Sequence, residues 1–144
     1  MKKYSLFLIL CIVCIFTMGC SKTPTPEVSM SDGNGIDIDL TVVSRTMAYA
    51  EVYDIMKNSE DYVGKIIKIA GRCVSSNQDS ELGFHYIIVE DETACCVESL
   101  EFIWIGERIY PDDDTIIEVV GKFESYENLG DIYYRLAVEN ITIL

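Results

Sequence analysis

The segment KIIKIAGRC, residues 65–73, alternates apolar and polar side chains over most of its length. Ile67, Ile69 and Cys73 fall on one face of an extended chain, and the lysine and arginine between them fall on the other. This pattern predicts a β-strand with one face in a core and one in solvent. Gly71, near its end, marks a position where a strongly curved sheet would bend.

Further strands are predicted on the C-terminal side of this segment, separated by turns rich in glycine, proline and aspartate. Their ranges are 84–90, 94–105, 115–124 and 132–143, and Gly130 closes a hairpin between the last two. Five short strands with glycines at bends are typical of a small Greek-key barrel. The sequence therefore predicts a mainly β protein, a five-stranded OB-like barrel, with an open β-sandwich carrying one helix as the alternative.

One α-helix is predicted on the N-terminal side of the barrel. Apolar residues recur at helical spacing over residues 45–58, and Ser44 stands where an N-cap residue is expected. Residues 36–43 form a short alternating stretch that leads into this helix. The predicted order is thus one helix followed by the barrel.

The first residues have the features of a bacterial lipoprotein signal peptide. Two lysines precede an apolar run from Leu6 to Met18, which is shorter than the roughly 20 residues that a membrane-spanning helix needs. Gly19 followed by Cys20 resembles a lipobox, in which the cysteine receives a diacylglyceryl group and becomes the first residue of the mature chain. We expect lipidation of Cys20 and attachment to the cell membrane on its extracytoplasmic side.

The chain is therefore expected to have three parts: a signal peptide at 1–19, a flexible tether at 20–35 and one OB-like domain at 36–144. The tether is rich in proline, serine, threonine and glycine. The whole chain has 24 acidic and 11 basic side chains, a net charge of −13, and the signal peptide takes away two lysines and no acid. Such a charge favours cations and basic partners and argues against nucleic acid as a partner.

The cysteines give the sharpest local feature. Cys11 and Cys14 lie in the signal peptide, which leaves Cys73, Cys95 and Cys96 in the domain. Cys73 shares a face with core residues, so we expect it to be buried. Two adjacent cysteines on a strand would point to opposite faces and would need a bend to act together.

Two interpretations of the cysteine pair remain open. Free cysteines often pack as small apolar residues, and this is the simpler interpretation. The other is a zinc, copper or thiol-redox site in which Cys95, Cys96 and His85 are the metal ligands. The residues specify no cofactor beyond this hypothesis. A Cys–His catalytic dyad lacks an evident orienting residue, so we expect no enzyme activity.

Several stretches together resemble a family of uncharacterised OB-fold lipoproteins from Gram-positive, clostridial-type anaerobes. They are IDIDL at 36–40, AEVY at 50–53, DYVGK at 61–65, TACC at 93–96, LEF at 100–102 and YPDD at 110–113. The cysteine pair is also similar to that in the extracytoplasmic domain of permease-associated proteins. This resemblance implies a role linked to transport or metal, with a membrane protein such as a permease as partner.

Composition, leader and motifs favour one function. We expect a membrane-anchored, extracytoplasmic and non-enzymatic module that binds a small ligand, a metal ion or a membrane protein. The alternative is a metal-binding or thiol-redox protein that uses the vicinal cysteines.

Overall fold

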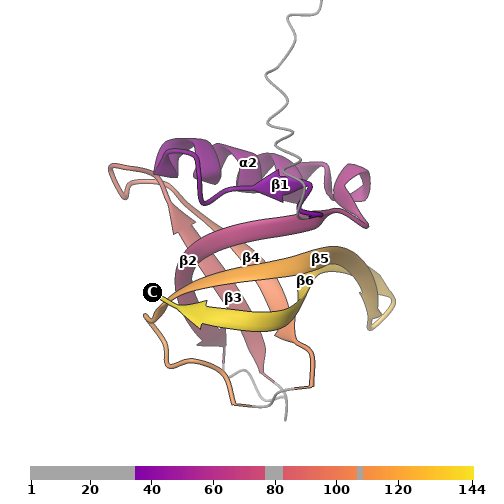
Figure 1. Cartoon of the computed structure of the whole chain (residues 1–144). Helices are drawn as coiled ribbons and strands as arrows, with labels where there is room; N and C mark the ends of the chain where they lie inside the picture. The colour runs from indigo at the N-terminus through magenta and orange to yellow at the C-terminus, as the bar shows by residue number, and fades with distance from the viewer. Residues whose placement is uncertain (1–34, 77–82, 107–108) are drawn as a thin grey trace, which may run out of the picture.

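The computed structural model describes residues 35–76, 83–106 and 109–144 (Figure 1). The predicted signal peptide, the lipidation site Cys20 and all of the tether but its last residue lie outside these ranges. Within them, no helix is both long enough and apolar enough to span a membrane.

The described chain forms one long helix, one short 3-10 helix and six strands. In chain order these are β1 (Ile38–Asp39), α2 (Arg45–Lys57), η1 (Ser59–Tyr62), β2 (Ile66–Ser76), β3 (Phe84–Glu90), β4 (Val97–Trp104), β5 (Ile116–Asn128) and β6 (Asp131–Ile143).

The five long strands close into a barrel. Their order around it is β2, β3, β4, β6 and β5, and β5 pairs again with β2. The β4–β6 pairing is parallel and the other pairings around the barrel are antiparallel. The short β1 adds to β2 in parallel. This is a five-stranded Greek-key barrel of the OB type, preceded by one helix, so the predicted fold is confirmed.

The barrel interior holds the alternating apolar residues of every long strand. Ile67, Ile69 and Cys73 of β2 are completely buried, as the alternation in residues 65–73 predicts. Phe102 and Phe123 are among the largest fully buried side chains. The core therefore forms from one face of each strand, as sequence periodicity requires.

Helix α2 covers one end of the barrel and contacts β3 and β4 (Figure 1). Ser44 caps it, with its hydroxyl accepting the backbone N–H of Met47 at 3.3 Å. Val52 and Ile55 are completely buried, so this face of the helix closes the core. The predicted range of 45–58 is confirmed to within one residue.

Two glycines permit close approach between strands. A Cβ atom on Gly71 would lie 2.5 Å from the carbonyl oxygen of Ile88 on β3. At Gly121, beside the register shift between β5 and β6 that skips Glu139, it would lie 2.9 Å from the carbonyl oxygen of Ala137 on β6. Both are positions where the barrel wall bends and any side chain would collide with backbone.

Strands β5 and β6 are longer than the barrel needs. β5 pairs with β2 only over Ile116–Lys122, and β6 pairs with β4 only over Leu136–Val138. Phe123 still exchanges backbone hydrogen bonds with Gly64 and Lys65, just before β2. Beyond Phe123, within the described residues, the two strands pair with each other alone, up to Asn128 and Asp131. The result is a two-stranded ribbon that extends past the barrel wall, on the right of Figure 1.

The start of β4 differs from the prediction. The expected strand at 94–105 begins only at Val97, because Ala94, Cys95 and Cys96 belong to the preceding turn. Ala94 has a left-handed φ of +53°, which is incompatible with an extended strand. The two cysteines therefore do not alternate across a sheet.

Candidate metal centre at the β3–β4 turn

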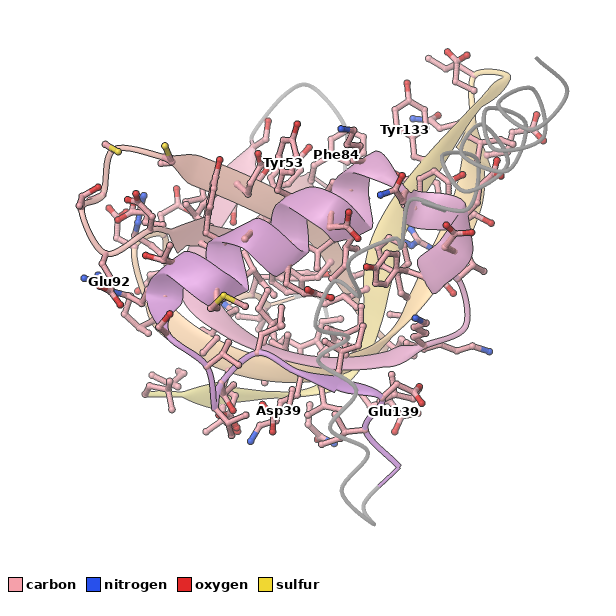
Figure 2. All side chains as sticks on the ribbon, turned by 90° about the horizontal axis from the view of Figure 1, so that it is seen from above. Asp39, Tyr53, Phe84, Glu92, Tyr133 and Glu139 are labelled. Atoms are coloured by element: carbon pink, nitrogen blue, oxygen red, sulfur yellow. The ribbon has the colours of Figure 1, made fainter. Side chains whose placement is uncertain are left out.

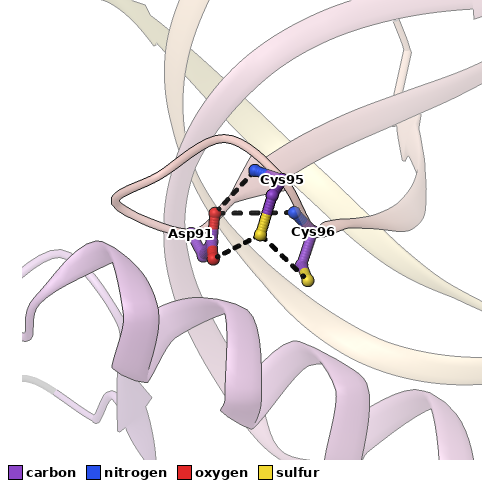
Figure 3. A group of neighbouring side chains, drawn as sticks. All are labelled: Asp91, Cys95 and Cys96. Carbon is purple, nitrogen blue, oxygen red and sulfur yellow. Dashed lines mark hydrogen bonds between the residues drawn. The ribbon is translucent and has the colours of Figure 1, made fainter.

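A six-residue turn, Asp91–Cys96, joins β3 to β4 (Figure 3). The backbone N–H of Asp91 donates to the carbonyl of Cys96 at 3.1 Å, and the N–H of Ala94 donates to the carbonyl of Asp91 at 3.1 Å. The left-handed Ala94 reverses the chain between these two bonds. The geometry of the turn places Cys95 and Cys96 outside strand β4 and next to the side chain of Asp91.

Three ligand-type atoms meet in this turn. The Sγ atoms of Cys95 and Cys96 lie 3.6 Å apart, and the Cys95 Sγ lies 3.5 Å from Oδ2 of Asp91. One ligand atom from each residue lies within 4.8 Å of the others. Both cysteines are exposed, so solvent and solutes reach the sulfurs.

The carboxylate of Asp91 has two separate tasks. Its Oδ1 accepts the backbone N–H of Cys95 at 3.0 Å and that of Cys96 at 3.5 Å, which fixes the turn. Its Oδ2 faces the Cys95 sulfur, and the Thr93 hydroxyl donates to it at 2.9 Å. One oxygen thus orients the backbone of both cysteines, while the other stands beside the thiol.

Helix α2 supports the turn from the side. A guanidinium nitrogen of Arg45 donates to the carbonyl of Glu92 at 3.1 Å, and the Thr46 hydroxyl accepts the N–H of Glu92 at 3.4 Å. One helical turn further on, the Tyr49 hydroxyl is a hydrogen-bond partner of Cys96. Figure 2 shows Glu92 beside the beginning of this helix. The helix end therefore holds both the backbone and one thiol of the turn.

The proximity of the two thiols controls their ionisation. The hydrogen bond with Cys95 and the charge of Cys95 raise the pKa of the Cys96 thiol. Desolvation and the charge of Asp91 raise this pKa further, whereas the hydrogen bond with Tyr49 lowers it. Desolvation of Asp91 acts to raise its pKa, but the hydrogen bonds donated by Thr93, by the Cys95 thiol and by two backbone N–H groups lower it overall. At neutral pH the cluster thus holds the Asp91 carboxylate beside a Cys96 thiol that loses its proton less readily than an ordinary cysteine.

This donor set suits a thiophilic cation. Two Zn–S bonds of about 2.3 Å at a tetrahedral angle place the sulfurs about 3.8 Å apart. The observed 3.6 Å is close to that separation. Two thiolates and one carboxylate leave one position of a tetrahedron open, and copper(I) also prefers thiolate ligands. The residues present therefore fit a zinc or copper ion in a shallow, accessible site.

The third expected ligand, His85, lies elsewhere. In the β3–β4 hairpin Glu90 pairs with Val97 next to the turn, whereas His85 pairs with Phe102. Five residues of strand, about 16 Å, separate His85 from Glu90. The grouping of His85 with the cysteines therefore needs correction, because a side chain far from the turn of a hairpin does not reach it.

His85 instead belongs to an aromatic cluster at the other end of β3. Its ring stacks on Tyr110 with centroids 3.4 Å apart, and its Nδ1 lies 2.9 Å from the Ser75 hydroxyl. Cys73 lies in the core, as expected, and burial raises the pKa of its thiol. Neither residue contributes to the turn.

Asp91 is the site residue that the sequence interpretation missed. The predicted ligand set was Cys95, Cys96 and His85, which contains no carboxylate. The available signal was an aspartate at a strand end with a cysteine four residues later, a spacing at which a carboxylate can accept backbone N–H groups across a turn.

The comparisons with known proteins add little to this geometry. No family model matches the chain, and no curated protein matches it. Among solved structures, the N-terminal domain of PriB from Thermoanaerobacter tencongensis aligns with a TM-score of 0.36 and 11% identity. The alignment covers 55% of this chain and 94% of that domain. The assignment of this chain to the OB-type barrels accordingly rests on its own strand order and pairing.

Proposed function

We propose that this protein is a non-enzymatic binding module, held outside the cell membrane by a lipid on Cys20, that binds a thiophilic metal ion at Asp91, Cys95 and Cys96. The observation that carries the proposal is the meeting of two exposed sulfurs, 3.6 Å apart, with one carboxylate oxygen. Three donors of this kind match the protein ligands of an open zinc site.

Metal binding fits the cysteine pair better than a disulfide does. Adjacent Cα atoms across a trans peptide are about 3.8 Å apart, whereas disulfides usually join Cα atoms that are about 4.4–6.8 Å apart. A bond between Cys95 and Cys96 would therefore be strained and easily reduced. The two thiolates can bind one ion without that strain, so we place thiol-redox chemistry second.

Three features of the sequence support the proposed location. They are the two lysines, the short apolar run and the Gly19–Cys20 step, which together resemble a lipoprotein leader. The resemblance to permease-associated domains supports a membrane protein as partner. The net charge of −13 favours a cation as ligand and disfavours nucleic acid.

Metal stoichiometry tests the proposal. Residues 20–144 carrying Cys20→Ser would be purified reduced and without chelator, loaded with Zn²⁺ and desalted, and metal would be counted by elemental mass spectrometry. We expect one zinc per chain, and loss of that zinc in Cys95→Ser and in Cys96→Ser. Glu92→Gln is the matched control, because this exposed acid lies in the same turn outside the donor set.

Two results would refute the metal site. One is a wild-type chain that retains no zinc and also no copper(I) when loaded anaerobically. The other is zinc that stays bound in the double variant Cys95→Ser/Cys96→Ser, which would place the ion elsewhere. A pair that cycles between dithiol and disulfide without binding metal would favour the redox alternative.

A further inference from the structure

At the tip of the β5–β6 ribbon, a leucine adopts a backbone conformation that leucine disfavours. Asn128 pairs with Asp131, so Leu129 and Gly130 form a two-residue loop. Both have positive φ values, +54° and +93°, as in a type I′ turn. Such loops favour Asn-Gly, since asparagine and glycine enter the left-handed region readily and leucine does not.

The side chain of Leu129 does not pack against the rest of the domain, so packing does not offset the cost of this conformation. Its side chain is 98% exposed. Ile132, three residues later, is 66% exposed, and Tyr133, which Figure 2 labels on the ribbon, is 43% exposed. An exposed apolar group at a strained position does not stabilise the fold, so it needs another explanation.

Acidic residues border this apolar tip. Glu127 pairs with Ile132 across the ribbon, and Asp131 follows Gly130 directly. The chain as a whole is also acidic, with a net charge of −13. These charges would be repelled by an anionic lipid surface and attracted by lysine and arginine side chains.

We propose that the hairpin tip is a docking element that inserts Leu129 into an apolar pocket of a protein partner, with basic side chains around the pocket contacting Glu127 and Asp131. A single apolar anchor surrounded by polar contacts is the usual arrangement of an interaction hot spot. The two-residue loop holds Leu129 in one place and limits the ordering cost of binding. The proposal does not depend on the metal site, which lies in a different turn.

Site-specific crosslinking in the intact cell tests the proposal first. A photoreactive amino acid would replace Leu129 in the full-length chain, and the same group at Thr142, an exposed position on β6 outside the ribbon, is the control. We expect irradiation to give one protein adduct at position 129 and none at position 142. The yield of the adduct at position 129 should fall when Asp131→Lys is added.

The partner protein identified by crosslinking would then be purified, and its affinity for this chain would decide the role of Leu129. Leu129→Asn should weaken binding roughly 10- to 100-fold, the value of one buried leucine side chain. Ile109→Asn, which alters an apolar residue that is 85% exposed outside the ribbon, should leave affinity within about twofold of wild type. Asparagine suits a left-handed position, so a circular dichroism spectrum like that of wild type should accompany the loss.

Several outcomes would overturn the proposal. They are no adduct above the level at position 142, an adduct with lipid, or an adduct with a second copy of the chain. Unchanged affinity in both Leu129→Asn and Leu129→Gly would exclude Leu129 as the anchor. A partner pocket lined by acidic side chains would contradict the expected charge complementarity.

Discussion

Asp91 accepts the backbone N–H of Cys95 on Oδ1 at 3.0 Å while its Oδ2 lies 3.5 Å from the sulfur of the same residue. One carboxylate thus both orients a cysteine and lies beside its thiol. In many metal sites these two tasks fall to different residues, a ligand and the group that orients it. Here a six-residue turn combines them, with helix α2 as the outer support.

Replacing Asp91 separates the two tasks. Asp91→Asn keeps an oxygen that can accept the N–H of Cys95, but it removes the negative charge and the anionic ligand. We expect zinc affinity, measured by calorimetry, to fall roughly 10- to 100-fold while the thermal midpoint changes little. Asp91→Ala should lose more affinity because the turn also loses its cap. Affinity equal to wild type in Asp91→Asn would show that the carboxylate only orients the turn.

Metal binding should release protons from the thiols. Neighbouring Cys95 raises the pKa of the Cys96 thiol above its ordinary value, so this thiol holds its proton to a higher pH than an ordinary cysteine and must lose it to bind metal. Zinc affinity should therefore increase with pH, by up to about tenfold per pH unit for the proton that Cys96 loses. Calorimetry in buffers of different ionisation enthalpy counts the protons. We expect Cys96→Ser to release about one proton fewer than wild type; a pH-independent affinity would exclude Cys96 as a ligand.

The three domain cysteines should differ in reactivity. Cys95 and Cys96 are exposed, whereas Cys73 is completely buried and burial raises the pKa of its thiol. In residues 20–144 carrying Cys20→Ser, intact mass spectrometry after alkylation should show two labels under native conditions and a third only in denaturant. Saturating zinc should protect the two reactive thiols. Rapid labelling of Cys73 in the folded protein would contradict the core as described.

Local pattern was enough to predict most of the fold. The alternation of Ile67, Ile69 and Cys73 identified β2, and the range 84–90 matches β3 at both ends. Each of these strands has one face in the core, so its sequence shows the period of two. The length of the β5–β6 ribbon was harder to predict, since residues of β5 beyond Phe123 have no barrel partner to impose that period.

The candidate site was harder to predict because it depends on one turn. Ala94, Cys95 and Cys96 precede Val97, and the sequence continues smoothly into a strand pattern. The Asp91 side chain overrides that pattern by accepting two N–H groups that a strand would use for pairing. His85 was grouped with the cysteines by residue type alone, although hairpin geometry places it away from the turn.

Leu129 gives a test of stability that separates folding from binding. A non-glycine residue in the left-handed region costs about 1–2 kcal/mol, and this side chain is 98% exposed, so its removal forfeits no packing. Leu129→Asn should therefore raise the free energy of unfolding by about 0.5–1 kcal/mol in urea at constant m-value. Ile132→Thr, an exposed β-branched exchange on the same ribbon, should change it by less than about 0.5 kcal/mol. If Leu129→Asn instead destabilises the domain by 1 kcal/mol or more, the leucine contributes to folding through a contact of the tip, and its exposure no longer points to a partner.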